Sequence, residues 1–198
     1  MLRGTNMSIK IGMVSLGCPK NQVDAELMLN KLCKDNNYEI VNDENKADVI
    51  IVNTCGFIED AKKESIETIL EFVQLKEQGK IKAVIATGCL AERYRDEMVK
   101  EIPELDGVVG IGCNGQIAEI VNKAVNIGHI ACYGKKTDLP MEGQRMLTTL
   151  AHTAYLKIAD GCDNCCTYCA IPMIRGPFRS RKIEDIVNEA NDLVSKGV

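Results

Sequence analysis

Short apolar runs alternate with longer helical stretches over the first 128 residues of the chain. The run at residues 48–53, DVIIVN, is continuous rather than alternating, as in a strand whose two faces are both buried. Strands separated by helical crossovers imply a parallel sheet with helices on both faces. We therefore predict that residues 8–128 form an α/β domain, a doubly wound parallel sheet of five strands. The expected strands are residues 10–15, 38–41, 48–53, 81–86 and 107–109, and the expected helices are residues 21–34, 59–78, 92–101 and 116–125.

The pattern changes in the last third of the chain. Glycine and proline residues interrupt residues 129–150, which we expect to form a linker or a hairpin. A further strand is predicted at residues 153–159, and a helix at residues 183–194. Because one strand and one helix cannot enclose a core, we expect residues 151–198 to be the truncated start of a second domain.

The composition excludes several classes of protein. The 198 residues include 24 basic and 28 acidic side chains, for a formal net charge of −4. That balance argues against binding nucleic acid through bulk positive charge. No apolar run approaches the ~18 residues of a membrane-spanning helix, and the first six residues contain nothing like a secretory signal. We expect a cytoplasmic protein without a membrane partner or direct contact with nucleic acid.

Ten cysteines are the unusual feature of the composition. Three of them, Cys18, Cys55 and Cys89, each follow an apolar strand-like run. In the strand order 2-1-3-4-5 those three strands are neighbours, so their carboxyl ends would meet at one edge of the sheet. Three thiolates with no histidine nearby suit an iron–sulfur cluster better than zinc. The alternative is that the three cysteines are small core residues.

A second set of cysteines is more compact. Cys162, Cys166 and Cys169 form a C-x3-C-x2-C motif, which can hold a [4Fe–4S] cluster that has one iron without a protein ligand. Cys165 lies inside this motif and creates two adjoining C-x2-C pairs, so a zinc site is the alternative.

The remaining cysteines lie alone in the sequence. Cys33 is expected on the side of its helix that faces the core. Cys113 and Cys132 have no assigned role. Because nothing marks the chain for export, we do not expect disulfides. The G-x-G-x-x-G pattern at residues 110–115 lacks the acidic residue that follows it in a dinucleotide site, and we interpret it as a turn.

These motifs and their flanking residues resemble the radical S-adenosylmethionine methylthiotransferases over nearly the whole chain. The C-x3-C-x2-C motif, with Tyr168 before its last cysteine, resembles the radical cluster motif of that family. Cys18, Cys55 and Cys89 match the three ligands of the family's auxiliary cluster, in its N-terminal domain. The flanking segments that also match are residues 52–57, 87–90, 175–176 and 179–181.

Two branches of the family differ near the first cysteine. Residues 15–24, SLGCPKNQVD, resemble the RimO branch, which adds a methylthio group to the β-carbon of an aspartate in a small-subunit ribosomal protein. The MiaB branch, which modifies a tRNA adenosine, usually has Gly-Cys-Gln-Met-Asn where this chain has Gly-Cys-Pro-Lys-Asn. A tRNA methylthiotransferase is the alternative, as is an iron–sulfur module without activity.

The resemblance implies two [4Fe–4S] clusters and S-adenosylmethionine as cofactors. Cys162, Cys166 and Cys169 would hold the cluster at which S-adenosylmethionine is cleaved to a radical, and Tyr168 would help to frame the adenine pocket. The auxiliary cluster would carry the sulfur for transfer. The ribosomal protein would be the substrate, and a flavodoxin or ferredoxin the electron donor.

The resemblance also implies that residues 151–198 begin a radical (β/α) barrel. Since most of that barrel is absent from the sequence, we expect the chain by itself to be inactive. Arg175, Arg179, Arg181 and Lys182 would contact carboxylates of the cofactor or the substrate, or else would form a solvated basic face.

Overall fold

The computed structural model describes residues 8–198, and the first six residues, in which the sequence shows no export signal, lie outside that range. Eight strands are present in the described part: β1 (Ile9–Ser15), β2 (Tyr38–Ile40), β3 (Val49–Thr54), β4 (Ala83–Gly88), β5 (Gly107–Val109), β6 (Ile130–Cys132), β7 (Ala159–Asp160) and β8 (Arg179–Ser180). The α-helices of that part are α1 (Pro19–Cys33), α2 (Glu59–Glu77), α3 (Cys89–Glu101), α4 (Ile117–Asn126), α5 (Ile171–Arg175) and α6 (Ile183–Ser195). Within residues 8–198, no helix combines the length and the apolar character that crossing a membrane requires.

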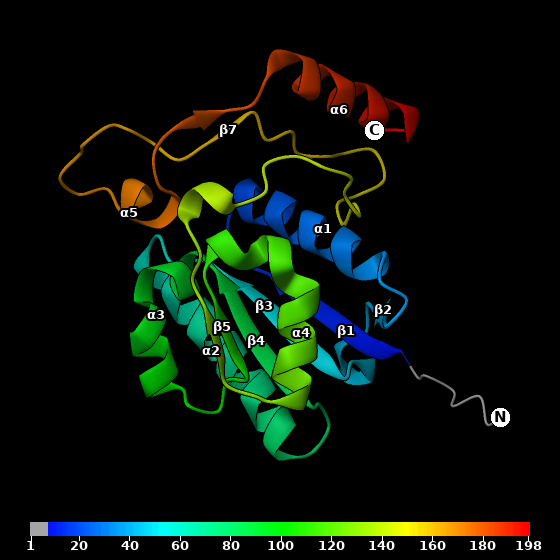
Figure 1. The fold of residues 1–198 in the computed structure, drawn as a ribbon, viewed down its shortest axis with the longest axis vertical. Coiled ribbons are helices and arrows are strands. Elements are labelled where there is room, and N and C mark those ends of the chain that lie inside the picture. The colour runs from blue at the N-terminus through cyan, green and yellow to red at the C-terminus, as the bar shows by residue number, and fades with distance from the viewer. Residues whose placement is uncertain (1–7) are drawn as a thin grey trace.

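The first six strands form one parallel sheet in the order β2-β1-β3-β4-β5-β6. Helices α1 and α4 cover one face of the sheet, and α2 and α3 cover the other (Figure 1). The predicted α/β class, the parallel sheet and the order of its first five strands are therefore confirmed.

Apolar packing on both faces holds this sheet together. In β3, Ile50 and Val52 belong to the cluster under α2 and α3, whereas Ile51 belongs to the cluster under α1 and α4. All three side chains are fully buried. Burying a side chain of this size contributes about 1.5–3 kcal/mol to stability. The continuous apolar run in the sequence is thus a central strand that needs both of its faces covered.

The sheet has a sixth strand that the sequence analysis placed in a linker. Strand β6 pairs with β5, with Ile130 opposite Gly107 and Cys132 opposite Val109. It has only three residues, none of them fully buried. An edge strand this short contacts the core on one side only, so it carries too few apolar residues for a recognisable pattern.

The C-terminal part contains less regular structure than we predicted. The expected strand at residues 153–159 is wrong: only Ala159 and Asp160 are in a strand, and they pair with β8 in antiparallel fashion. A barrel strand needs parallel neighbours on both sides, and the described residues supply none for this segment. The residues after β6 instead run across α1 and lead into α6 (Figure 1), and no barrel start is shown.

Candidate metal centre

The three separated cysteines lie at the carboxyl ends of adjacent strands. Cys18 is three residues beyond β1 and is the N-cap of α1, where Pro19 favours the start of a helix because its backbone angle is already helical. Cys55 directly follows β3, and Cys89 directly follows β4 and begins α3. Cys55 and Cys89 are buried, and Cys18 is exposed. The structure therefore brings the three loops to one edge of the sheet.

Glycines beside these cysteines allow the loops to touch. A Cβ atom at Gly17 would lie 2.7 Å from Cys55 Cβ and 2.9 Å from its Sγ. One at Gly56 would lie 2.8 Å from the backbone nitrogen of Leu90, and one at Gly88 would lie 2.7 Å from the backbone nitrogen of Thr54. Such distances are too short for any side chain, so the backbones meet only because these residues are glycines. A glycine next to each of the three cysteines is a signal in the sequence that our prediction did not use.

Buried polar side chains fix the same loops. The Asn21 side chain donates to the carbonyl oxygens of Leu16, at 3.0 Å, and Thr54, at 2.8 Å. The Ser65 hydroxyl accepts from the Cys55 amide at 3.0 Å and donates to the Cys55 carbonyl at 3.1 Å. Because a buried backbone group is costly to leave without a partner, these bonds hold each loop in one conformation.

The Cys89 thiol has two polar neighbours. Its Sγ lies 3.4 Å from Asn21 Oδ1, to which it donates, and 3.3 Å from Arg175 Nη2, which donates to it. Burial raises the pKa of the Cys89 thiol to about 11, and the positive charge of Arg175 opposes that rise. A guanidinium beside a sulfur atom favours the thiolate, the form that binds metals.

Arg175 is buried in a network of charges that we call the buried ion network, made of Asp24, Lys157, Asp160 and Arg175. The Arg175 guanidinium contacts Asp24, and its Nη1 lies 3.2 Å from Asp160 Oδ2. Lys157 Nζ lies 2.6 Å from Asp24 Oδ1 and 3.5 Å from Asp160 Oδ2. Burial alone would raise the pKa of Asp160, but the charges of Arg175 and Lys157 hold it below its usual value. The network joins α1 to the C-terminal part of the chain.

Of the four basic residues singled out after the second cysteine set, Lys182 is exposed, but the three arginines do not form a solvated face. Arg175 and Arg181 are both buried, and Arg181 is paired with Glu189. The Arg179 guanidinium donates to the backbone carbonyl oxygens of Thr137, at 2.6 Å, and Lys136, at 3.1 Å. These three arginines therefore connect parts of the chain, and the interpretation as a solvated basic face does not describe them.

The second cysteine set lies on the loop between β7 and α5. Cys162 and Cys169 are partly buried, and Cys165 and Cys166 are exposed. The Cys162 amide donates to the Gly176 carbonyl at 3.1 Å, and the Cys169 amide donates to the Cys166 carbonyl at 3.1 Å. The loop is thus anchored at its start, next to Gly176, and is exposed in its middle, at Cys165 and Cys166. Tyr168, predicted beside an adenine, is 91% exposed.

In neither cysteine set do the side chains converge on a single metal position. Among residues 8–198, no three His, Cys, Asp or Glu side chains converge as closely as a single metal ion requires. The donors at the sheet edge are nevertheless all sulfur atoms, the ligands that iron–sulfur clusters take. A cluster is larger than one ion and takes its thiolates from several directions, which suits three thiols on three touching loops. The residues present therefore fit an iron–sulfur cluster in their chemistry.

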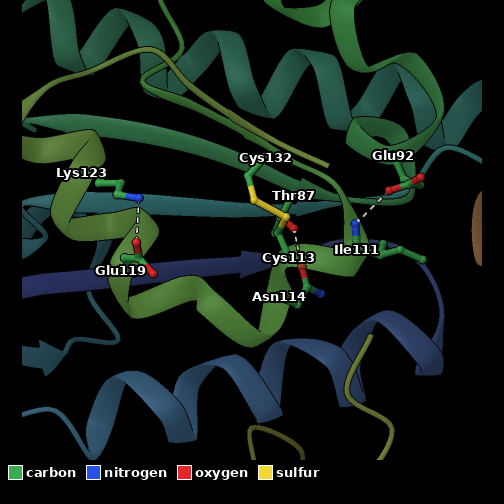
Figure 2. The surroundings of a disulfide bond; sticks show 8 residues. All are labelled: Thr87, Glu92, Ile111, Cys113, Asn114, Glu119, Lys123 and Cys132. Atoms are coloured by element: carbon green, nitrogen blue, oxygen red, sulfur yellow. Dashed lines mark hydrogen bonds and ion pairs between the residues drawn. A yellow bond between two sulfur atoms is a disulfide. The ribbon is translucent and has the colours of Figure 1, made fainter. Parts of the chain in front are cut away.

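Two cysteines without an assigned role form a disulfide, contrary to our prediction (Figure 2). Cys113, in the short helix η2 (Ile111–Gln116) after β5, is bonded to Cys132 at the end of β6, with 6.1 Å between their Cα atoms. The sequence could not reveal the pairing, because it depends on the unpredicted strand β6. Cys33 is also misplaced by the prediction, since it ends α1 in an exposed position rather than in the core.

The glycine-rich pattern at residues 110–115 forms most of the 3₁₀ helix η2, with Gly110 as its N-cap, rather than the turn that we predicted. At the start of η2 the Ile111 amide donates to Glu92 Oε2 at 3.1 Å (Figure 2). A carboxylate of the chain itself therefore occupies the position at which a phosphate would bind.

A groove of about 580 Å³ between α2 and α3 contains none of the cysteines.

Comparison with known proteins gives a consistent result. A family model described as "Uncharacterized protein family UPF0004" matches residues 10–110. The "Ribosomal protein uS12 methylthiotransferase RimO" of Thermoanaerobacter sp. (strain X514) is 55% identical over 189 residues, which are 95% of this chain and 43% of that protein. Proteins of the same name from Clostridium novyi (strain NT) and Geobacter sulfurreducens are 52% and 49% identical, over 96% and 98% of this chain.

The chain spans less than half the length of these relatives, 42% of the Clostridium novyi protein and 43% of the other two. Within that length the match runs through both cysteine sets. The chain therefore belongs to protein family UPF0004 and corresponds to the N-terminal portion of RimO-type methylthiotransferases.

Proposed function

We propose that this chain is the cluster-binding part of an enzyme that adds a methylthio group to the β-carbon of an aspartate in ribosomal protein uS12. The observation that carries the proposal is the 49–55% identity to uS12 methylthiotransferases over at least 95% of the chain. The tRNA-modifying alternative is not favoured, because these relatives are named for a ribosomal protein.

We assign the cofactors to the two cysteine sets. Cys18, Cys55 and Cys89 hold an auxiliary [4Fe–4S] cluster, and the ligands of a second [4Fe–4S] cluster, which binds S-adenosylmethionine, are Cys162, Cys166 and Cys169. When bound, these groups supply one-electron reduction of S-adenosylmethionine and a sulfur atom for transfer. Cys165 is not a ligand in this assignment.

The chain's own residues position these groups and limit their contact with water. The buried thiols of Cys55 and Cys89 give the auxiliary cluster a site with little solvent. The close glycine contacts and the Asn21 bonds favour one arrangement of the loops that carry the thiols. Tyr168, exposed on the second loop, is free to frame an adenine ring from one side.

We extend the proposal to the organisation of the protein. A methylthiotransferase N-terminal domain covers residues 8–128 and is continued by β6, and the radical domain starts at residue 151. The working enzyme is cytoplasmic and takes electrons from a flavodoxin or ferredoxin. Alone, the chain does not complete the reaction, because radical chemistry needs a site closed to water and competing partners.

A chimera tests the function directly. The matching 189 residues of the Thermoanaerobacter relative are replaced by this chain, and the product is incubated anaerobically with reductant, S-adenosylmethionine, sulfide and uS12. Mass spectrometry should detect methylthio-aspartate in uS12, whereas the same chimera carrying Cys18→Ala should produce none. An inactive chimera beside an active relative, or modification of tRNA instead of uS12, would contradict the proposal.

A further inference from the structure

Two consecutive residues contact both cysteine sets. The side chain of Arg175 reaches the Cys89 sulfur at 3.3 Å, and the carbonyl of Gly176 accepts from the Cys162 amide at 3.1 Å. Cys89 and Cys162 are 73 residues apart in the sequence, and one belongs to each set. Residues 175 and 176, joined by one peptide bond, therefore link the two sets through one hydrogen bond to each.

The position of Gly176 is fixed by close backbone contacts. Its backbone has a positive φ of 78°, and a Cβ atom at Gly161 would lie 2.0 Å from the carbonyl oxygen of Pro177. The turn before Cys162 and the turn after Arg175 thus pack backbone against backbone. A movement of Arg175 would be passed on to the first cysteine of the second set.

The four hydrogen bonds of the Arg175 guanidinium divide into two kinds. Nη1 faces the carboxylates of Asp24 and Asp160, which compensate its charge. Nη2 faces two uncharged groups, the Asn21 side-chain oxygen and the Cys89 sulfur. Lys157 already contacts both carboxylates, and the partly exposed Lys20 lies 3.4 Å from Asp160 Oδ1, so neither carboxylate needs Nη2 to compensate its charge. Charge pairing accounts for the position of Nη1 between two carboxylates. It does not account for Nη2, a buried donor directed at the Cys89 sulfur.

We propose that Arg175 is a positioning residue for the auxiliary cluster: it donates a charge-assisted hydrogen bond to the Cys89 sulfur and ties the second cysteine loop to the first site. The proposal rests on the proposed function, in which Cys89 is a cluster ligand. Hydrogen bonds to the sulfurs of an iron–sulfur cluster stabilise its reduced, more negative state and raise its reduction potential. Arg175 would therefore set both the potential of one cluster and the place of the other.

The first test measures the reduction potential of the auxiliary cluster. Cys162, Cys166 and Cys169 are replaced by alanine so that one cluster remains, and redox titration is followed by electron paramagnetic resonance. Arg175→Lys keeps the charge that Asp24 and Asp160 need but removes the donor to Cys89. We expect the reduction equilibrium to shift about tenfold toward the oxidised form, which is about 59 mV for one electron.

The matched control is Arg179→Lys, since Arg179 binds backbone carbonyl oxygens and contacts no cysteine. It should leave the potential unchanged. A purely structural role for Arg175 would change stability without moving the potential. Normal iron binding with the same potential in wild type and Arg175→Lys would overturn the proposal.

The second test needs no cluster. In the metal-free full chain, Arg175→Met should speed amide hydrogen exchange of residues 157–176 at least tenfold, because the charge-assisted bonds that hold this segment are lost. Exchange in β3 and β4 should not change. Unchanged exchange at residues 157–176 would overturn the tie between the loops. Absence of iron from Cys18, Cys55 and Cys89 in the wild-type chain would instead contradict the proposed function, while this second test still decides whether Arg175 holds the loop.

Discussion

The sheet and the segment that follows it are stabilised by different forces. From β1 to β6, apolar clusters fill both faces of the sheet. Beyond residue 132, only Leu139, Ile174 and Leu193 are buried apolar residues, and nine of the fifteen exposed large apolar side chains of the described chain lie there. Buried charged groups hold this segment to α1 instead. Its position therefore depends on a few specific pairs, whereas the sheet depends on many interchangeable contacts.

Two networks make these connections. The first is the buried ion network of Asp24, Lys157, Asp160 and Arg175. The second, which we call the Arg145 network, consists of Glu26, Arg145, Arg181 and Glu189. Each network has an acidic residue on α1 and basic residues from beyond residue 132. Removing one partner from such a network leaves an uncompensated buried charge, which is far more costly than losing one surface pair.

The largest effect is expected from the core of the sheet. Ile51→Ala removes a fully buried side chain of β3 and should lower the free energy of unfolding by roughly 2–5 kcal/mol. Ile158→Ala, the same change at a residue that is 59% exposed in the C-terminal segment, should cost less than about 0.5 kcal/mol. Urea denaturation measures both. Equal losses would show that the two regions are not stabilised differently.

The next effect should be confined to the C-terminal segment. Arg145 Nη1 lies 3.1 Å from Glu26 Oε2, and Arg145 Nη2 lies 2.8 Å from Glu189 Oε1. Arg145→Met should weaken docking of the segment by about 3 kcal/mol, because Glu26 is left buried without its main partner. Limited proteolysis should then cut within residues 133–160 while β3 and β4 stay protected.

The control for this variant is Lys196→Met, which breaks an exposed pair between Lys196 and Asp192. Exposed pairs of this spacing contribute only about 0.3–0.5 kcal/mol, so proteolysis should not change. If Arg145→Met resisted protease as well as the wild-type chain does, the Arg145 network would not be what holds the segment.

A smaller, pH-dependent effect is expected at the opposite edge of the sheet. Burial alone would raise the pKa of Asp48, but the Lys10 amide and Lys82 hold it below its usual value. Since the folded pKa is the lower one, the stabilisation is present above the unfolded value of about 3.9 and is lost as the pH falls through the folded value. Asp48→Asn should cost about 1 kcal/mol at pH 7. Urea titrations should show this difference shrinking below about pH 4, and a constant difference would contradict the assignment.

The smallest effect is expected at Cys165. Its thiol is exposed, and the C-x3-C-x2-C motif is complete without it. Cys165→Ala should therefore leave the iron content and the cluster spectra unchanged after anaerobic reconstitution. Loss of the second cluster in this variant, together with tolerance of Cys166→Ala, would exchange the roles of the two residues.

The sequence predicted the sheet well because a strand buried on both faces carries its own signature. The runs that became β3 and β4 are apolar over most of their length, and the one helix between them, α2, is long enough for a crossover. Strand β6 lacked that signature, since three half-exposed residues at an edge look like a loop. The disulfide between Cys113 and Cys132 was hidden for the same reason.

The prediction failed for the C-terminal segment because the buried residues there are not the hydrophobic ones. Ile158 is exposed and Lys157 is buried, the opposite of a core strand. Arg175 is buried because Asp24 lies beside it, 151 residues earlier in the chain. Such a partnership leaves no local trace in a sequence. The positions of Cys18, Cys55 and Cys89 followed from the strand order, whereas the donor to Cys89 did not.

Iron and sulfide counts after anaerobic reconstitution test the central claim, that two cysteine sets in two differently stabilised regions each hold a cluster. The wild-type chain should approach about eight irons, and replacing either Cys18, Cys55 and Cys89 or Cys162, Cys166 and Cys169 with alanine should leave about four. Cys33→Ala, which removes an exposed cysteine outside both sets, should keep about eight. Iron content that stays at the wild-type level when Cys18, Cys55 and Cys89 are replaced would contradict the claim.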